Sequence, residues 1–105
     1  MESRKKTAAK IADHYGLDNQ ISIAQEECAE LVQALSKLRR VGLDGSNSPG
    51  VPYINARIHV AEEMADVQNM LFQLTHLLNC EEIMTFWLDQ KHAKTLAKME
   101  VAHES

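Results

Sequence analysis

Cysteine, aromatic residues and excess positive charge are all scarce in this sequence, and each shortage excludes a class of protein. Two cysteines among 105 residues are too few for a disulfide framework or a cysteine-rich zinc site. Aromatic residues make up 5% of the chain, which argues against a platform of rings stacked on nucleic-acid bases. The net charge of −4 leaves no general excess of basic residues for neutralising phosphates. We therefore expect no nucleic-acid polymer among the partners of this chain.

Long apolar runs are missing as well. No stretch approaches the roughly 18 apolar residues that a bilayer span requires, and no secretory apolar core follows the charged residues 1–6. We therefore expect no membrane partner and a cytoplasmic location. Cys28 and Cys80 lie in apolar helical patterns, which predicts reduced thiols that are buried as small hydrophobic groups.

Glycine and proline gather in residues 42–52, and this cluster predicts the main loop of the chain. Elsewhere apolar residues recur at helical spacing, and we find no strand pattern. The sequence predicts an all-α fold, a helical bundle in which residues 1–105 form a single domain. The expected helices are residues 2–15, 19–41, 53–78 and 80–102. Because a chain of this length has much surface for its volume, we also expect it to associate with further copies of itself.

Several residues predict where the helices begin and end. Gly16 suits the left-handed conformation just beyond a helix end. Asp18 or Asn19 can cap the start of the second helix with a side-chain oxygen. Asn79, followed three residues later by Glu82, predicts an N-cap for the last helix.

One acidic pattern occurs twice. Residues 26–31 read Glu-Glu-Cys-Ala-Glu-Leu, and residues 62–67 read Glu-Glu-Met-Ala-Asp-Val. Helix positions three apart share a face, so the second and fifth residues of each copy point the same way. Each acidic edge lies beside an apolar face, and antiparallel packing through these faces would bring four carboxylates to one margin of the core. These residues are Glu27, Glu30, Glu63 and Asp66.

Four carboxylates held close together repel one another unless a cation neutralises them. Mg²⁺ prefers carboxylate and water oxygens, so the pattern predicts a Mg²⁺ site, with Mn²⁺ as a substitute. Mg²⁺ usually takes only one or two carboxylates from a protein, so the set fits either one ion or two. The chain has no matching cysteine and histidine set for zinc. Only residues 100–103 have the Glu-x-x-His form that a di-iron bundle uses twice.

The alternative is a non-catalytic helical interaction module whose acidic edges only keep it soluble. Solvated helix faces usually place a lysine or arginine four residues after an acid. Neither copy of the motif does so, because the residues at these positions are Leu31, Ala34, Val67 and Met70. The doubled motif and the missing basic residues favour the metal site.

The two motifs, Glu-Glu-x-x-Glu-Leu and Glu-Glu-x-x-Asp-Val, resemble the MazG-like, all-α nucleoside triphosphate pyrophosphohydrolase superfamily over roughly residues 14–98. By position, the resemblance implies that the four acids of the motifs bind Mg²⁺. It implies hydrolysis of a nucleoside triphosphate, such as a dNTP or a modified nucleotide, to the monophosphate and pyrophosphate. It also implies a MazG-like four-helix bundle that is completed in a homodimer or homotetramer, with active sites at subunit contacts.

The fourth helix of that family often carries a lysine, an asparagine four residues later and an arginine three residues after that. Lys91, Thr95 and Lys98 stand at these positions here. The resemblance therefore implies phosphate contacts by Lys91 and Lys98, although the amide is replaced. The stretch between the motifs is also longer than is usual in the family. Trp87, in an apolar run of the same helix, is expected to pack in the core or at an interface.

Further residues beside the motifs are candidates for catalysis and substrate binding. In the implied reaction a water attacks the α-phosphorus, and Glu26, Glu62 or a metal-binding carboxylate orients that water. Asn69, on the acidic face of its helix, is expected either to bind sugar or phosphate or to support a metal ligand. His59, one turn before the second motif, is expected near the substrate or on the plain helix surface. A house-cleaning hydrolase for a non-nucleotide diphosphate, such as a phosphoribosyl compound, is a further alternative.

Overall fold

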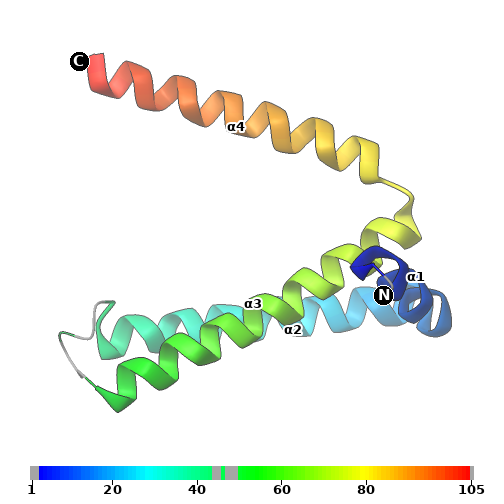
Figure 1. The fold of residues 1–105 in the computed structure, drawn as a ribbon, viewed down its shortest axis with the longest axis horizontal. Helices are drawn as coiled ribbons and strands as arrows, with labels where there is room; N and C mark the ends of the chain where they lie inside the picture. Colours follow the sequence, from blue (N-terminus) through cyan, green and yellow to red (C-terminus); the bar gives the residue numbers. More distant parts are fainter. Residues whose placement is uncertain (1–2, 44–45, 47–49, 105) are drawn as a thin grey trace.

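The computed structural model describes residues 3–43, 46 and 50–104, and these residues form helices without any strand, so the predicted all-α class is confirmed. α2 and α3 run antiparallel as a long hairpin, and α1 crosses the end of the hairpin opposite its loop (Figure 1). The four helices are α1 (Arg4–Tyr15), α2 (Leu17–Val41), α3 (Val51–Leu78) and α4 (Glu81–Glu104).

The main loop lies where the glycine and proline cluster predicts it, but it ends earlier. α3 begins at Val51, with Pro52 in its first turn. Proline suits this place because the first N–H groups of a helix have no partner within the helix. Residues 44–45 and 47–49 of the expected loop 42–52 lie outside the described residues.

The junction between α1 and α2 is a single residue. Gly16 ends α1 with a φ of 86°, and its N–H donates to the carbonyl oxygen of Ala12 at 2.8 Å. The same glycine precedes the first residue of α2, so Asp18 and Asn19 lie inside that helix. The prediction that one of them caps α2 is therefore wrong. Glycine adopts a positive φ without strain, which lets the chain turn from one helix directly into the next.

The junction between α3 and α4 also differs from the prediction. Asn79 has φ 49° and ψ 46°, the left-handed conformation that closes many helices, and its N–H donates to the carbonyl oxygen of His76. Asn79 thus ends α3 instead of capping α4. Cys80 precedes α4, and its carbonyl oxygen accepts the N–H of Met84 at 2.8 Å.

The core of the chain lies between α2 and α3, with α1 packed mainly on α3. Its buried apolar side chains are mostly small, which lets the helices approach closely but removes little apolar area from water. They are Ala8, Ala12, Ala34, Ala56, Val60 and Met70. This core is small for the length of the chain.

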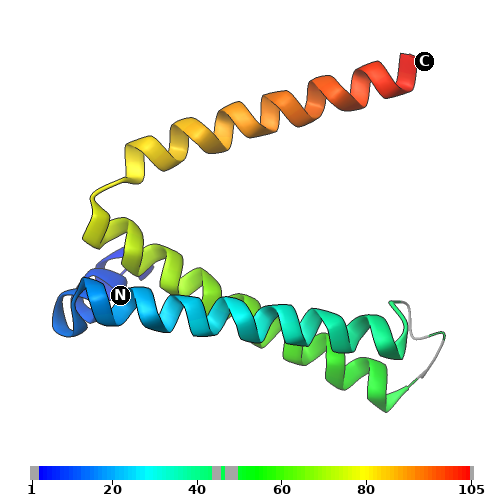
Figure 2. The same ribbon diagram turned by 180° about the vertical axis from the view of Figure 1, so that it is seen from behind.

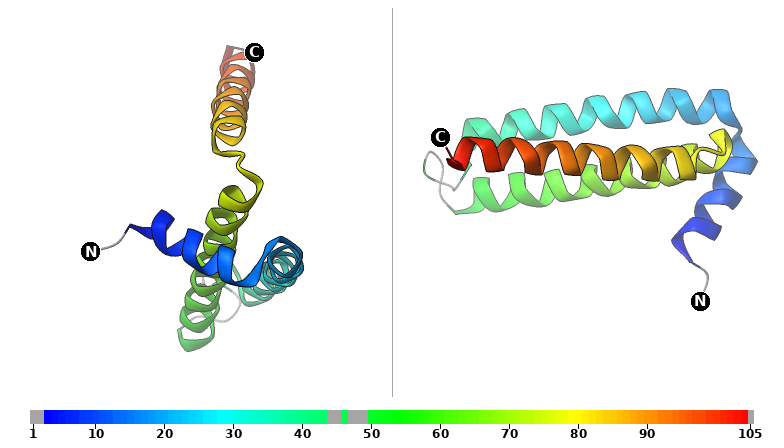
Figure 3. Two further views of the ribbon diagram at one scale, coloured as in Figure 1. Left: turned by 90° about the vertical axis from the view of Figure 1, so that its right-hand side faces the viewer. Right: turned by 90° about the horizontal axis from the view of Figure 1, so that it is seen from above.

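α4 stands apart from the other helices. Every described side chain of α4, residues 81–101, is exposed. α4 runs lengthwise over the hairpin and rises away from it toward the C-terminus (Figures 2 and 3). Its base is tied to α1 by an ion pair between Lys5 and Glu81. A single chain therefore does not close into a four-helix bundle.

Three side chains are less buried than the sequence predicts. Cys28 is exposed and Cys80 is half-buried, so the prediction of two buried thiols is wrong. Cys28 lies on the flank of α2 that points away from the small core. Trp87 is 52% exposed on α4, so it does not belong to the core of one chain, and its packing at an interface stays a prediction. None of the described helices has the length and apolar character needed to cross a membrane.

Candidate metal centre

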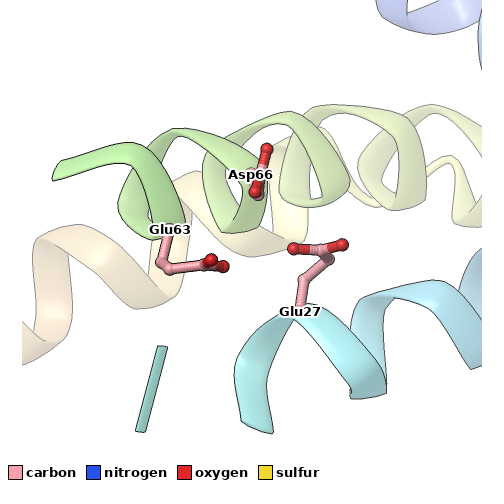
Figure 4. Close-up of side chains that lie close together, drawn as sticks. All are labelled: Glu27, Glu63 and Asp66. Carbon is pink, nitrogen blue, oxygen red and sulfur yellow. The ribbon is translucent and has the colours of Figure 1, made fainter. Parts of the chain in front are cut away.

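The hairpin brings both acidic motifs together at its middle. The antiparallel direction of α2 and α3 places the first motif opposite the second, and close packing at alanine positions holds the helices at short range. Glu27 of α2 faces Glu63 and Asp66 of α3 (Figure 4). One carboxylate oxygen from each of these three residues lies within 4.8 Å of the others. We call these three residues the acidic cluster.

The acidic cluster is partly buried. The Glu63 residue is only 8% exposed, and Glu27 and Asp66 are half-buried. The Oε2 atoms of Glu27 and Glu63 are both buried and have no hydrogen-bond partner among the described residues. An ionised carboxylate is costly to bury without a compensating partner. Two such oxygens in residues of one cluster fit a site that holds a cation.

Both glutamates of the cluster are harder to ionise than usual. Burial raises the pKa of Glu27, and the negative charges of Glu30, Asp66 and Glu63 raise it further. Burial also raises the pKa of Glu63, with further contributions from Glu30 and Asp66, while the nearby His59 acts in the opposite direction. A divalent cation at this point would remove the repulsion, because it lies close to all of these charges.

Glu30, the fourth predicted ligand, lies at the rim. It is exposed and is not one of the three residues whose oxygens lie within 4.8 Å of one another. Its charge nevertheless raises the pKa of both Glu27 and Glu63, which places it in electrostatic range of the cluster. The structure thus divides the predicted set into three converging acids and one peripheral acid.

His59 lies beside the cluster, one turn before Glu63 on α3. Its Nε2 is 3.4 Å from Oε1 of Glu63, and its side chain is 48% exposed whereas that of Glu63 is 10% exposed. The histidine therefore reaches from the surface to the buried carboxylate. This position suits a residue that steadies a ligand or meets a substrate at the mouth of the site.

The remaining candidates on the hairpin are exposed side chains that lie close to the acidic residues along the chain. Glu26 and Glu62 are exposed, and each precedes a residue of the cluster in the chain. Asn69 is exposed on α3, one turn beyond Asp66. All three side chains are therefore open to solvent.

Lys91 and Lys98 are not brought to the cluster within one chain. Both are exposed on α4, and Lys91 Nζ lies 6.0 Å from the centre of the Trp87 ring. α4 begins beside Thr75, whose Oγ1 lies 3.7 Å from Sδ of Met84. Thr75 is nine residues after Asp66, which is about 180° around α3 at about 100° per residue. The base of α4 and the acidic cluster therefore lie on opposite sides of α3.

Two buried amides were not anticipated from the sequence. Gln20 on α2 is 2% exposed and Gln73 on α3 is 6% exposed, and Oε1 of Gln20 has no hydrogen-bond partner among the described residues. Gln20 lies seven residues before Glu27, and Gln73 lies seven residues after Asp66. Seven residues are close to two helical turns, so both amides continue the stripe of their helix that carries the acids. That spacing is the signal by which they could have been found.

No protein-family model matches this chain, and comparisons with curated proteins and with solved structures gave no match. The chemistry of the centre is therefore inferred from its own residues and from the paired motif.

Proposed function

We propose that this chain is a Mg²⁺-dependent hydrolase that converts a nucleoside triphosphate to the monophosphate and pyrophosphate. The observation that carries the proposal is the convergence of Glu27, Glu63 and Asp66, with two buried oxygens that have no hydrogen-bond partner in the described chain. The substrate class comes from the likeness of the paired motif to MazG-like pyrophosphohydrolases.

The residues of the cluster fit Mg²⁺ by their chemistry. They offer only carboxylate oxygens, which are the ligands that Mg²⁺ and Mn²⁺ prefer, and no thiol or imidazole belongs to the three. They lie on two long helices that are packed against each other, so the ligands are held by a rigid support. Three carboxylates with Glu30 at the rim suffice for one ion or for two that share a ligand.

A bound Mg²⁺ supplies charge neutralisation for phosphate oxygens during phosphoryl transfer. Glu26 and Glu62 are exposed and each precedes a residue of the cluster in the chain, and one of them or a carboxylate of the cluster would accept a proton from the attacking water. The water oxygen then bonds to the α-phosphorus, the bond from that phosphorus to the bridging oxygen breaks, and pyrophosphate leaves. Asn69 and His59, which are exposed on α3, would contact sugar or phosphate.

We also propose that several copies of the chain, a homodimer or a homotetramer, complete the helical bundle. In one chain α4 leaves the hairpin on the side opposite the acids, so Lys91 and Lys98 have no access to the cluster of their own chain. Another copy is the available source of these lysines for phosphate binding. The enzyme would then act as an oligomer.

The proposal is tested by metal binding and by substrate turnover. Isothermal titration with Mg²⁺ is expected to show saturable binding, and the absence of such binding contradicts a metal centre. A panel of dNTPs, NTPs, modified nucleotides and phosphoribosyl diphosphates, assayed for the released products, identifies the substrate. Saturable Mg²⁺ binding without turnover of any compound would favour the non-catalytic interaction module.

Single variants distinguish the roles of Glu26 and Glu62 in orienting the attacking water. Glu26→Gln or Glu62→Gln, whichever removes the residue that orients the water, is expected to lower kcat by about 100-fold while Mg²⁺ affinity stays unchanged. Glu82→Gln, an exposed glutamate on α4, is the matched control. Full activity in both Glu26→Gln and Glu62→Gln would mean that a carboxylate of the acidic cluster itself orients the attacking water.

A further inference from the structure

Gln20 and Gln73 form a buried polar layer at the end of the hairpin that α1 crosses. Gln20 lies seven residues before Glu27, and Gln73 lies seven residues after Asp66. In antiparallel helices, equal steps in these opposite directions along the two chains lead to the same level. Because Glu27 and Asp66 face each other in the acidic cluster (Figure 4), the two glutamines also face each other across the hairpin. We call these two residues the amide layer.

The amide layer is buried, but its hydrogen bonds are incomplete. Gln20 is 2% exposed and Gln73 is 6% exposed. Oε1 of Gln20 has no hydrogen-bond partner among the described residues, although a second amide faces it on α3. Structural amides in protein interiors normally bond to each other or to the backbone, because an unpaired buried amide destabilises the folded chain. The amide layer therefore calls for a partner that is not part of the chain.

The orientation of the Gln20 amide indicates which partner it takes. Its Nε2 donates to Oδ1 of the neighbouring Asn19 at 3.5 Å, which leaves Oε1 as the unpaired atom. A carbonyl oxygen accepts hydrogen bonds and cannot donate them. The partner of Gln20 must therefore present an N–H or O–H group.

The amide layer lies at a fixed distance from the acidic cluster. Seven helical residues rise about 10.5 Å and return to nearly the same side of the helix. The sugar and base of a nucleotide extend from its α-phosphate over a length of the same order. A nucleotide whose phosphates lie at the cluster therefore has the length to bring its base to the amide layer.

We propose that the amide layer recognises the base of the substrate, with Oε1 of Gln20 accepting a hydrogen bond from an amino group of that base. This inference rests on the proposed function, because the phosphates at the acidic cluster place the base. The edges of adenine and cytosine each carry an amino donor beside a ring nitrogen that accepts, and an amide pairs with such an edge through both of its ends. The substrate class is then a nucleoside triphosphate with an amino-bearing base.

α1 covers the amide layer. Two helices alone leave the outer sides of their contact open to water, so the burial of Gln20 and Gln73 requires a third element. α1 crosses the hairpin at this level (Figure 1), because Oδ1 of Asp13 lies 2.8 Å from Nε2 of His76, three residues after Gln73. The buried side chains of α1 are alanines, which do not interlock with their neighbours as larger side chains would.

The base reaches the amide layer when α1 lifts from the hairpin. The Asp13–His76 and Lys5–Glu81 ion pairs of α1 join exposed side chains, and exposed ion pairs contribute little stability. Gly16 alone separates α1 from α2, and its positive φ shows that the turn uses the freedom of glycine. α1 can therefore be displaced without breaking the α2–α3 contact that holds the acidic cluster.

The first test measures binding and does not require turnover. α,β-Methylene triphosphates keep the phosphate chain but lack the bond that the proposed reaction breaks. Those of adenosine and cytidine are compared with those of purine riboside and 2-pyrimidinone riboside, which are the same compounds without the amino group. In calorimetric titrations with Mg²⁺, at least one amino-bearing compound is expected to bind about tenfold more tightly than its partner, as one hydrogen bond contributes. Equal binding within both pairs would overturn the proposal.

The second test assigns this preference to Gln20. Methionine has a similar volume, so Gln20→Met keeps the seam filled and removes an unpaired buried oxygen. The preference for the amino group is expected to vanish, while the Kd values for Mg²⁺ and for the compounds without the amino group stay unchanged. A merely structural glutamine would not produce this selective loss.

Two further variants support the second test. Gln73→Met removes the facing amide and is expected to reduce the same preference, which provides a second measurement if Gln20→Met does not fold. Gln68→Met is the matched control, because Gln68 is exposed and lies about 200° around α3 from Asp66. A folded Gln20→Met that keeps the preference of the unaltered chain would overturn the proposal.

Pyrophosphate release from ATP and CTP, measured beside these titrations, separates this inference from the proposed function. Preferential binding of an amino-bearing compound without turnover would support base recognition and contradict hydrolysis. Turnover without any preference for the amino group would support hydrolysis and overturn base recognition by the amide layer. The absence of all nucleotide binding would overturn both.

Discussion

The α2–α3 hairpin and α4 obtain their partners in different ways. The hairpin finds its partner within the chain, because its two helices are joined by a short connection and face each other through small residues such as Ala34 and Ala56. α4 has large apolar side chains on several sides and almost no partner in the same chain. The acidic cluster is therefore formed within one chain, whereas the described side chains of α4 are left uncovered by it.

The largest expected effect comes from removing a carboxylate of the hairpin. Glu63→Gln or Asp66→Asn should lower pyrophosphate release by about 1,000-fold, since a metal contributes several kcal/mol to the stability of the transition state. Mg²⁺ binding by titration should be lost as well, while the helical signal is kept. Retained activity in both variants would mean that the metal centre does not depend on these residues of the hairpin. The contrast between the hairpin and α4 would then fail.

The next effect tests whether α4 serves a different copy. The double variant Lys91→Ala/Lys98→Ala should lower kcat/KM by about tenfold or more, as expected when charge-assisted contacts to phosphate are lost. Mg²⁺ affinity should be unchanged, and Lys37→Ala on α2 is the control. Mixing this variant with Glu63→Gln should restore part of the activity if the lysines act across copies. If the mixture does not regain activity, the acidic cluster and the lysines that serve one active site belong to the same chain.

A smaller effect concerns pH and the stability of the hairpin without metal. The pKa values of Glu27 and Glu63 are raised above their ordinary 4.5, so the folded chain binds protons more tightly than the unfolded chain. These two groups therefore favour the folded state most at and below pH 4.5, and this contribution falls as the pH rises through the raised pKa values.

Thermal unfolding in a chelator should accordingly show a midpoint that falls from pH 4.5 toward pH 7. The decline should be shallower in Glu63→Gln and unchanged in Glu82→Gln. At pH 7, Mg²⁺ at 100 times its Kd should raise the midpoint on the order of 10 °C. A midpoint that rises steadily with pH in the chelator would mean that the two carboxylates are not strained by burial and repulsion.

The smallest effect on Mg²⁺ affinity is expected for a variant on the hairpin surface that faces away from the acidic cluster. Val32 is exposed and lies about 140° around α2 from Glu27, so Val32→Glu should change the Kd for Mg²⁺ by less than about threefold. Titration of the variant at a concentration where it is monomeric measures this directly. A large loss of Mg²⁺ affinity would show that the centre needs a second copy and is not complete in the hairpin.

Much of the local structure could be predicted from the sequence. The spacing of apolar residues located four helices to within a few residues, because helical hydrogen bonds join residues four apart and need no distant partner. The errors occurred at junctions. The sequence predicts Asn79 at the start of α4, but Asn79 ends α3; it predicts Asp18 or Asn19 as the cap of α2, but Gly16 precedes that helix. These choices depend on the backbone conformation of one residue, which composition alone does not determine.

For the candidate site, too, the sequence predicts one part and the tertiary structure decides the rest. The repeated motif by itself determined that Glu27 and Glu30 share one helix face and that Glu63 and Asp66 share another, and with this the expectation of a hard cation. Only the tertiary structure decided that these three converge, that Glu63 is the most buried of them and that Glu30 stays at the rim. Convergence of the three carboxylates depends on the rotational orientation of each helix about its axis, which is set by the small residues packed between the two helices.

The placement of α4 was decided entirely by the tertiary structure. Its apolar pattern predicts a helix over residues 80–102, and the structure has it at Glu81–Glu104, but the pattern does not determine what covers it. A helix forms through hydrogen bonds within itself, so the sequence of the segment suffices to specify it. Its direction is set by the turn at Asn79 and the packing around it, and these send α4 away from the hairpin with its apolar side chains uncovered.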